Sequence, residues 1–457
     1  MQEVVHDAER LKELQALPLE RKVQISQARI IEWYQHWKGQ VCVSFSGGKD
    51  STVLLHLVHQ IYPDVKAVFV NTGLEYPEIQ KFARQKGADI VTPSLRFNEV
   101  ITTYGYPLIG KEVAEAIYYA RRIRSQDVHV ERERERTAER KQRELQGRRK
   151  QNEEDRTLLA DGLETERTHW GGTAQSVESG AKKDFSGNFK RITIMGGETY
   201  STERSSHPDR LCKEQKRRGN DLNGKFGTGV VKSQFNKEKW LPLAQELNAN
   251  ISHYCCFTMK KSPMKKYQRA NKVKPYLGTL ATESRVRKQA WIRNGCNAFD
   301  AKNPSSQPLS FWTEQDILAY IVRYGLEIAS VYGEIVNVGD DGYNYAPVDL
   351  FGEIGRNLHC TGCERTGCMF CGFGLHLEKG ETRFQRLART HPRQYEYCIG
   401  GGKWSDNPNY DSAAPKYDGE WKNWNPKKIW TPSEKGLGMG KLFDMVNDIY
   451  GKDFYRY

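Results

Sequence analysis

A glycine turn between an apolar strand and an apolar helix constrains the fold of this chain more than any other feature. The segment SGGKDS, residues 46–51, follows the apolar residues 41–45 and leads into the apolar stretch 51–62, which Pro63 ends. In an α/β sheet such a turn presents backbone amides and the positive end of a helix to an anion, and glycine leaves room for it. The spacing differs from a Walker A loop because Asp50 separates Lys49 from Ser51. The segment therefore predicts a phosphate-binding loop of another type.

The segments around this turn alternate between strand and helix patterns in units of about thirty residues, which indicates a parallel sheet covered by helices. The expected strands are residues 41–45, 65–70, 89–91 and 275–279. The expected helices are two before residue 40 with a break near Pro18, then 51–62, 77–86, and 310–324 with Thr313 as N-cap. The predicted fold class is therefore α/β, a parallel sheet with flanking helices.

Length and composition indicate more than one structural unit. A chain of 457 residues exceeds one compact core, and its 28% charged residues leave room for solvated stretches. Residues 121–156 alternate in charge with almost no apolar side chains, so we expect a charged, partly disordered insertion. The predicted units are an N-terminal helix with the first half of the phosphate-loop domain (1–120), the insertion (121–224), the remainder of that domain (225–350) and a cysteine-rich, aromatic tail region (351–457).

Charge and hydropathy limit the partners. The chain has no run of about 18 apolar residues and no secretory signal pattern, so we expect a cytoplasmic protein without a membrane partner. Its net charge is +13, and residues 259–293 hold 11 Lys or Arg against one acidic residue, Glu283. This basic stretch is either a solvated face or a route for an anionic substrate, with nucleic acid as one alternative.

The cysteines are grouped rather than scattered. Ten cysteines are too few for a disulfide scaffold in a chain of this length, and in a reducing compartment clustered cysteines more often hold metal or do redox chemistry. Two are adjacent and four form C-x2-C-x4-C-x2-C; these are Cys255, Cys256, Cys360, Cys363, Cys368 and Cys371. Zinc is an alternative for the four, although zinc ribbons usually separate their pairs by about a dozen residues or more.

Four segments together resemble the phosphoadenosine phosphosulfate (PAPS) reductase family of PP-loop proteins, which implies a Rossmann-like adenine nucleotide alpha hydrolase fold. They are SGGKDS at 46–51, NTGLEYPE at 71–78, GTLATESRVR at 278–287, and Pro308-Leu309 with Trp312, Thr313 and Asp316. The resemblance covers residues 40–107 and 225–393 and leaves the charged insertion unmatched. Leu280 replaces the first arginine of the family's third segment, so a contact to the sulfate or phosphate tail is missing.

The resemblance implies a site for an adenine nucleotide, either ATP or PAPS as substrate. The residues expected to bind it are Ser46, Gly47, Gly48, Lys49, Asp50 and Ser51, then Thr72, Gly73 and Glu75, and finally Gly278, Glu283, Ser284 and Arg287. Lys49, Asp50 and Arg287 are also catalytic candidates: Arg287 would neutralise the outer anion, and Asp50 would bind Mg²⁺ if the ligand is ATP.

The resemblance further implies a [4Fe–4S] cluster, which assimilatory sulfonucleotide reductases ligate with a CC pair and a distant G-C-x-x-C pair. The matching residues here are Cys255, Cys256, Cys368 and Cys371, with Cys360, Cys363 and Cys296 as reserves.

The family's reductases also use a nucleophilic cysteine in an E-C-G-L-H tail, whereas this chain ends GKDFYRY. Cys398 is the candidate for a free nucleophile, and Cys42 in the first strand is expected to be a buried small hydrophobe.

The missing tail favours ATP-dependent sulfur transfer, as in DNA-phosphorothioation relatives. In that scheme an anionic substrate attacks the α-phosphorus of ATP, pyrophosphate leaves, and sulfur displaces AMP. A nucleic acid is a candidate substrate, and a cysteine desulfurase or a thiol reductant is the expected donor partner. One alternative is a thiol-dependent sulfonucleotide reductase acting through Cys398. The other is a non-catalytic nucleotide-sensing or nucleic-acid-binding module.

Overall fold

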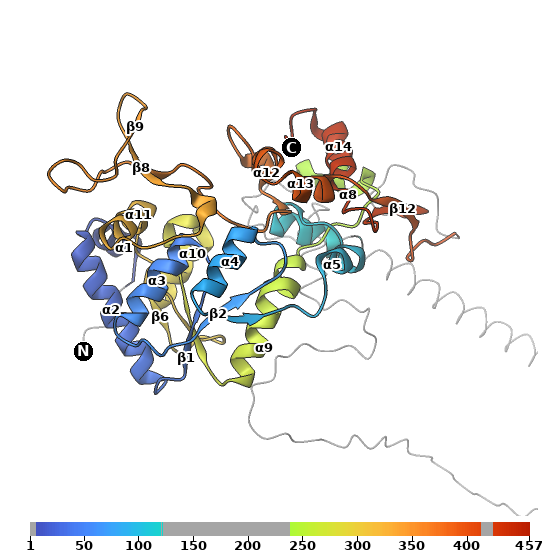
Figure 1. Cartoon of the computed structure of the whole chain (residues 1–457). Coiled ribbons are helices and arrows are strands. Elements are labelled where there is room, and N and C mark those ends of the chain that lie inside the picture. The colour runs from blue at the N-terminus through green and yellow to red at the C-terminus, as the bar shows by residue number, and fades with distance from the viewer. Residues whose placement is uncertain (1–5, 120, 122–237, 413–423) are drawn as a thin grey trace, which may run out of the picture.

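The computed structural model describes residues 6–119, 121, 238–412 and 424–457 (Figure 1). The charged insertion predicted at 121–224 lies outside the described residues except for Arg121. Within the described residues no helix is both long and apolar enough to span a membrane. The division into units at residues 225 and 350 stays a prediction.

A six-stranded sheet forms the centre of the N-terminal part, in the order β3-β2-β1-β5-β7-β6. All neighbouring pairs are parallel except β6 with β7. Val43 of β1 lies opposite Ala67 on one side and Tyr276 on the other, so β1 is central. The strands are β1 (Val41–Ser44), β2 (Ala67–Val70), β3 (Asp89–Val91), β5 (Lys274–Leu277), β6 (Asn297–Ala298) and β7 (Ser305–Ser306). The predicted α/β class with a parallel sheet is confirmed.

Helices cover both faces of this sheet because its crossovers run in opposite directions from β1. The connections β1 to β2 and β2 to β3 proceed one way, and those into β5 and β7 proceed the other way, so right-handed crossovers place their helices on opposite faces. Val43 belongs to the main core, whereas its neighbour Cys42 packs with Val68 and Met264 beneath α9. The helices concerned are α3 (Lys49–His59), α4 (Pro77–Gln85), η3 (Phe257–Lys261), α9 (Ser262–Ala270), η4 (Ala281–Glu283) and α10 (Arg285–Asn294).

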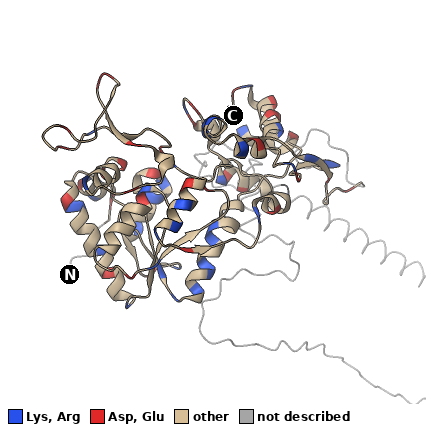
Figure 2. Cartoon of the chain, viewed as in Figure 1, with Lys and Arg blue, Asp and Glu red and all other residues tan. Residues whose placement is uncertain are grey.

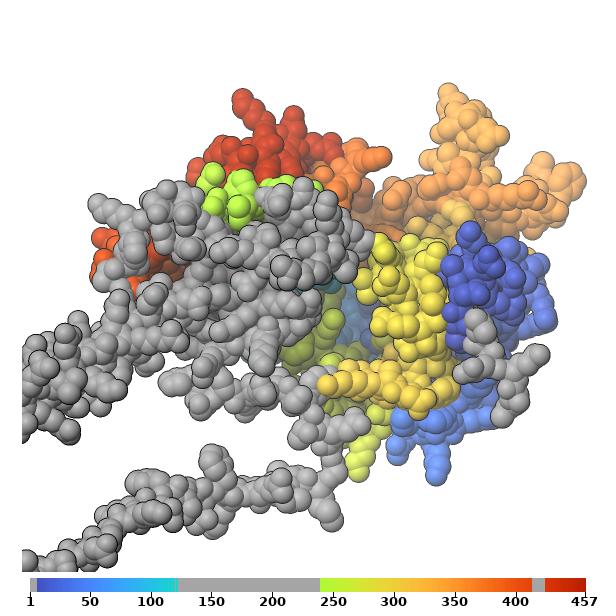
Figure 3. All heavy atoms as spheres, turned by 180° about the vertical axis from the view of Figure 1, so that it is seen from behind, coloured from blue at the N-terminus to red at the C-terminus, as the bar shows by residue number. Residues whose placement is uncertain are grey.

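The N-terminal helices α1 (Ala8–Gln15) and α2 (Leu19–His36) pack against this domain, separated at Pro18 as predicted. The buried Lys22 ammonium donates to the Gln15 carbonyl and the Asp316 carboxylate, both at 2.7 Å. Asp316 also closes a capping box with Thr313 at the start of α11 (Glu314–Arg323). Seen from behind, the N-terminal residues lie beside the α10 region (Figure 3), where the His6 and Trp291 rings are 5.2 Å apart.

The C-terminal residues fold into a second group of elements beside the sheet (Figure 1). Tyr106 donates to the Leu437 carbonyl at 2.7 Å, and the Ile109 amide donates to the Tyr455 hydroxyl at 2.8 Å, so residues far apart in sequence share one core. Its first elements are α5 (Phe97–Tyr104), β4 (Leu108–Ile109), a helix at 111–119, η2 (Glu238–Trp240) and α8 (Leu241–Glu246). Its last are β11 (Gly372–Phe373), η6 (Leu375–Leu377), α12 (Arg383–Thr390), α13 (Pro392–Ile399), β12 (Lys403–Asp406), β13 (Lys428–Thr431) and α14 (Met439–Tyr450).

Arg121 connects the helix at 111–119 to the residues around the end of α8 through hydrogen bonds. Its guanidinium is buried and donates to the carbonyls of Leu243, Ala244, Leu247 and Ala249 around the end of α8. Burial lowers its pKa to about 9. The guanidinium also lies 3.7 Å from the centre of the Trp424 ring. In the aromatic tail, Trp404 of β12 lies opposite Trp430 of β13 in an antiparallel strand pair.

A small separate sheet lies next to α11 and extends away from the main sheet (Figure 1). Its strands run in the order β10-β8-β9, with antiparallel pairs throughout. The bounds are η5 (Ser330–Tyr332), β8 (Ile335–Val338), β9 (Asn344–Tyr345) and β10 (Leu358–Cys360). Because β10 ends at Cys360, this sheet carries the first cysteine of the C-x2-C-x4-C-x2-C motif.

The buried Lys22–Asp316 pair yields a stability prediction. Lys22→Met should lower the free energy of unfolding by about 3 kcal/mol, because it leaves the Asp316 carboxylate without its cation in a poorly solvated position. Urea denaturation followed by tryptophan fluorescence would measure the loss. The matched control is Arg10→Met, whose exposed pair with Glu13 should contribute less than about 1 kcal/mol. Equal losses in the two variants would contradict the prediction.

Candidate functional site

The glycine turn lies at the carboxyl end of β1 and caps the start of α3, as the sequence predicts. The Ser46 amide donates to the Ser51 hydroxyl at 3.2 Å, and this hydroxyl donates to the Gly48 carbonyl at 2.9 Å. Gly47 has φ +71°, and a Cβ there would approach Ile79 Cγ2 to 2.7 Å. The turn is therefore closed by its own serine and tolerates only glycine at position 47.

Lys49 and Asp50 begin α3 inside a cluster of charges. The Lys49 ammonium is buried and contacts the Glu314 carboxylate at 2.6 Å. Burial raises the pKa of the Asp50 carboxyl, while the positive charges of Lys49, Arg365 and Arg287 act against this rise. Three cations therefore surround the start of α3, where the helix dipole already favours an anion.

The segment after β5 contributes Gly278, Glu283, Ser284 and Arg287 to the same edge. A Cβ on Gly278 would lie 3.1 Å from the Asp50 carbonyl, so glycine permits the close approach of β5 to the start of α3. Ser284 is the N-cap of α10, and Arg287 forms an ion pair with Glu283. These residues thus position Arg287 near Asp50.

Leu280, which replaces an arginine of the family pattern, is buried in the core. Arg365 supplies a positive charge from another direction: its side chain is exposed and its charge acts on both Asp50 and Arg287. Its neighbour Thr366 is hydrogen-bonded to the Tyr332 hydroxyl at 2.6 Å. A Cβ on Gly48 would lie 3.3 Å from this Tyr332 hydroxyl.

Sequence reasoning missed Arg365, Tyr332 and Thr366. Tyr332 and Thr366 border the phosphate loop, and the charge of Arg365 reaches its Asp50. Arg365 and Thr366 lie between Cys363 and Cys368 of the C-x2-C-x4-C-x2-C motif, in which the sequence analysis considered only the cysteines. No spacing signal links Tyr332 to the phosphate loop, because tertiary folding brings the two together.

Thr72 and Glu75, at the end of β2, form a compact buried network. Thr72 donates through its amide and its hydroxyl to the Glu75 carboxylate at 2.8–2.9 Å. The Lys260 ammonium lies 3.2 Å from the same carboxylate, and it also interacts with the Cys368 thiol. Gly73 is exposed next to this network. Lys260 therefore links the end of β2 to the cysteines. From the sequence, Lys260 was expected to be only one of the residues of a basic stretch.

The four cysteines predicted to hold a cluster lie close enough for their charges to act on one another. Cys368, Cys256 and Cys371 all act electrostatically on Cys255, and Cys256 also acts on Cys371. Burial raises the pKa of Cys368 to about 12, against the opposing charge of Lys260. Buried thiols need a cation before they ionise, and iron provides one in thiolate-ligated clusters. The donor set therefore fits the chemistry of an iron–sulfur cluster.

No three His, Cys, Asp or Glu side chains in the described parts of the chain are arranged to hold a single metal ion. A multi-iron cluster separates its cysteine sulfurs by its own width, so this result does not conflict with the convergence of the four thiols. It does disfavour one zinc ion bound by the whole C-x2-C-x4-C-x2-C motif, because its two halves face different neighbours. Cys360 is near Lys49, whereas Cys368 is near Lys260.

Cys398, the candidate nucleophile, is enclosed in the second group of elements. Its side chain on α13 is fully buried, and its sulfur lies 3.4 Å from Met439 Sδ. Burial raises the pKa of Cys398 well above the ordinary value. A nucleophilic cysteine needs a stabilised thiolate and access to substrate, so this environment argues against the sequence-based role. Cys42 is buried as expected, and Cys296 lies in the core beside Ser310.

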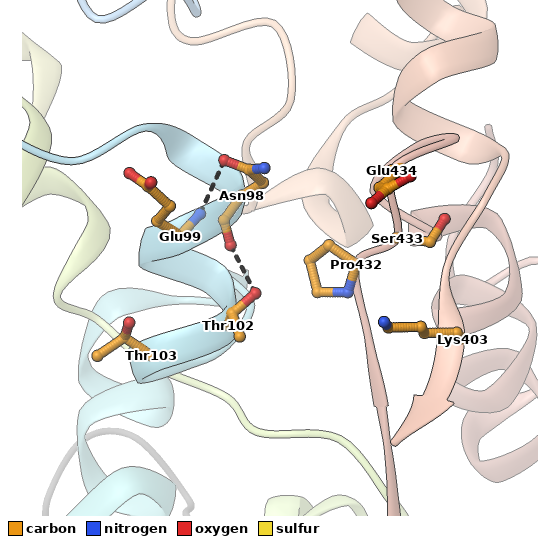
Figure 4. A pocket seen from close by; sticks show the side chains of 8 residues that line it. All are labelled: Asn98, Glu99, Thr102, Thr103, Lys403, Pro432, Ser433 and Glu434. Atoms are coloured by element: carbon orange, nitrogen blue, oxygen red, sulfur yellow. Dashed lines mark hydrogen bonds between the residues drawn. The ribbon is translucent and has the colours of Figure 1, made fainter.

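One cavity borders the predicted nucleotide residues. Its volume is about 480 Å³, and its wall includes Thr72, Gly73, Arg96 and Phe370. A second hollow of about 340 Å³ lies between α5 and the β12–β13 hairpin (Figure 4). It is lined by Thr102 and Lys403 among others but by none of the predicted site residues, and we assign it no role. The first cavity therefore adjoins the site.

The basic stretch 259–293 does not form one continuous face. Figure 2 shows Lys and Arg along α9 and both signs of charge over the other helices. Within the stretch, Lys260 and Arg287 turn toward carboxylates of the site, whereas Lys266 and Arg269 on α9 are exposed. Part of the excess positive charge therefore serves the site itself.

Comparison with known proteins gives a family and several partial relatives. The family model described as "Phosphoadenosine phosphosulfate reductase domain" matches residues 40–160 and 213–372, more than half of the chain. A phosphoadenosine 5'-phosphosulfate reductase of Xanthomonas campestris pv. campestris (strain B100) is 32% identical over 106 residues, which is 23% of this chain and 41% of the relative. One from Xylella fastidiosa (strain M12) is 31% identical over 88 residues, 19% of this chain and 35% of the relative.

An uncharacterized protein of Methanocaldococcus jannaschii is 31% identical over 86 residues, 17% of this chain and 21% of that protein. The chain thus spans less than half the length of each of these relatives. The family match itself extends over both the phosphate loop and all six grouped cysteines. On this evidence the chain belongs to the phosphoadenosine phosphosulfate reductase family of PP-loop proteins.

Proposed function

We propose that this chain is an adenine-nucleotide-dependent sulfur-transfer enzyme, in which ATP bound at the phosphate loop activates an anionic acceptor. The observation that carries the proposal is the meeting of two kinds of group at one edge of the sheet. A phosphate loop with Lys49 and Arg287 lies there, and the Thr72–Glu75–Lys260 network connects that edge to the cysteines. This arrangement supports a single site for anion binding and sulfur chemistry.

The nucleotide would be held by its phosphates on the amides of residues 46–48 and on Ser51, with Lys49 and Arg287 balancing their charge. Lys49 must then exchange its Glu314 partner for phosphate oxygens, which is feasible because Glu314 is partly exposed. Asp50 would bind Mg²⁺ when the ligand is ATP. Gly73 and the cavity beside Thr72 would receive the remainder of the nucleotide.

Cys255, Cys256, Cys368 and Cys371 would hold a [4Fe–4S] cluster. Such a cluster supplies electron-transfer or electrostatic chemistry close to the substrate. Lys260 would then share its positive charge between Glu75 and the cluster thiolates. The acceptor is anionic in this proposal, with nucleic acid as the candidate that the exposed Lys266 and Arg269 of α9 support, and a cysteine desulfurase would be a suitable sulfur donor.

The second candidate is a sulfonucleotide reductase, and the names of the relatives favour it. Two of the partial relatives are phosphoadenosine 5'-phosphosulfate reductases, and their similarity to this chain reaches 32% identity. In this reading the loop binds PAPS or adenosine phosphosulfate intact, and a protein thiol attacks its sulfur. Arg365 would supply the cation that Leu280 does not.

Product analysis separates these candidates. Anaerobic protein would be incubated with labelled ATP and nucleic acid, or with PAPS and a dithiol. ATP-dependent transfer predicts pyrophosphate release that nucleic acid stimulates and that salt weakens steeply. Formation of sulfite from PAPS without ATP would instead identify the protein as a sulfonucleotide reductase. Binding of nucleotide without either product would leave a non-catalytic nucleotide-binding module.

Gly48→Val should abolish nucleotide binding, because a side chain at this position meets the Ser46 and Tyr332 hydroxyls at 3.3 Å and blocks the loop amides. Isothermal titration calorimetry with ATP and PAPS would measure the loss. The control is Gly110→Val, where an added Cβ has no heavy atom within 4 Å, and its affinity should stay at the wild-type value. Unchanged affinity in Gly48→Val would disprove the loop assignment.

The cluster assignment predicts about four irons per chain in anaerobically purified protein, with a brown colour. Cys368→Ala should lose the iron, because a thiolate ligand disappears. Cys42→Ala, at a buried thiol on β1, should keep it. Iron and sulfide analysis with visible spectroscopy would decide, and zinc in place of iron would refute the cluster.

A further inference from the structure

An exposed apolar turn lies in the small sheet beside α11, within the connection from β9 to β10. Leu350 and Phe351 are adjacent there, and their exposed fractions are 100% and 91%. Folded chains seldom leave two large apolar neighbours uncovered unless that surface meets a partner. The turn has no role in the proposed nucleotide and cysteine sites. It therefore points to a contact with another molecule.

Hydrogen bonds hold this turn in a defined shape. The Asp349 carboxylate accepts the backbone amides of Phe351 and Glu353, both at 2.8 Å. The Asp349 amide donates to the Glu353 carbonyl at 2.9 Å, and behind it Val348 and Ile354 form an antiparallel bridge. The apolar pair is thus presented at the end of a closed hairpin. Its exposure is a property of an ordered element.

The segment that carries the apolar pair is acidic. Residues 334–356, which we call the acidic tip, contain five acidic residues against one basic residue, Arg356. All five are exposed; they are Glu334, Asp340, Asp341, Asp349 and Glu353. The whole chain, by contrast, carries a net charge of +13. The acidic tip would repel an anionic partner such as nucleic acid and attract a positively charged surface.

One surface of this chain has the opposite charge. Residues 257–272, which cover η3, α9 and the turn after it, hold six Lys or Arg and no acidic residue. Lys260 turns toward Glu75 and is not part of this surface. The exposed members, which we call the basic face, are Phe257, Lys261, Lys266, Arg269 and Lys272. An aromatic ring that is 49% exposed among cations complements the acidic tip in both charge and apolar character.

The acidic tip and the basic face lie far apart in one chain. In Figure 1 the small sheet is at the top of the molecule, whereas α9 is at the bottom. We propose that the acidic tip of one copy docks on the basic face of a second copy, so that the chain associates head to tail. Such a contact joins two different patches, and it therefore builds a closed ring or an open chain of copies. This inference does not depend on the proposed function.

The charges favour this contact over one between two acidic tips. A tip-to-tip contact would place like charges together as the apolar pairs met. Docking on the basic face covers Leu350 and Phe351 while the neighbouring carboxylates approach lysines and an arginine. The end of a hairpin covers a small area, so we expect a dissociation constant of about 1 to 100 μM that increases with salt.

Sedimentation velocity of the full-length, anaerobically purified and nuclease-treated protein tests the contact. At low salt the average mass should rise with concentration up to about 100 μM, and in about 1 M NaCl it should fall to that of a monomer. Phe351→Ser and Lys266→Glu should each weaken association by at least about tenfold, since one removes an apolar contact and the other reverses a cation. The matched controls Leu377→Ser and Lys428→Glu, at exposed positions elsewhere, should associate like the wild type.

A mixture of the two defective variants tests the head-to-tail geometry. Phe351→Ser keeps its basic face and Lys266→Glu keeps its acidic tip, so an equal mixture should form dimers through one intact contact although each variant alone stays monomeric. No recovery in the mixture would overturn the inference, because a tip-to-tip contact predicts that result. A wild type that is monomeric at about 100 μM and low salt, or association that Lys266→Glu leaves unchanged, would also overturn it.

Discussion

The close packing of three strand ends around the start of α3 is the constraint on which the rest of the site depends. Gly47 turns the chain with a positive φ against Ile79, and Gly278 lets β5 approach the Asp50 backbone so closely that an added Cβ would lie 3.1 Å from it. Parallel strands with right-handed crossovers bring their carboxyl ends to the same edge. Three segments that are far apart in the sequence therefore meet at this edge: the phosphate loop, the Thr72–Glu75 network and the Arg287 segment.

Paired charges, of which the Lys49 ammonium is buried, give this edge its chemical character. Lys49 is neutralised by Glu314, Lys260 by Glu75, and Arg287 by Glu283, so each cation already has a carboxylate partner. A buried cation without a partner would strongly destabilise the fold. Such pairs keep the cations in place, and an anionic ligand can take over a partner that is partly exposed, as Glu314 is. The same arrangement explains why the excess of basic residues at 259–293 does not form a uniform surface.

The predicted and observed elements agree where the local sequence pattern determines the secondary structure. The strand at 89–91, the break at Pro18 and the Thr313 N-cap appear as the sequence indicates. The family segment from Pro308 to Asp316 has a structural use that the sequence did not suggest: Ser26 of α2 donates to the Pro308 carbonyl, Trp312 donates to Ser26, and Asp316 holds Lys22. In the cysteine motif, Cys360 lies near Lys49 whereas Cys368 lies near Lys260, which the spacing alone did not indicate.

The sequence by itself determined the class of fold, the glycine turn before α3 and the family, because glycine spacing and the alternation of apolar runs are local properties that can be read from the sequence. It also named four cysteines whose charges act on one another, two of which interact with Lys260. Only the tertiary structure decided which further side chains reach the loop. Arg365, Tyr332 and Cys360 arrive from the small sheet beside α11 and from the loop that follows it, and Cys398 is withdrawn into the core. Such contacts join residues about three hundred positions apart, and their geometry depends on how whole layers pack rather than on any neighbouring residue.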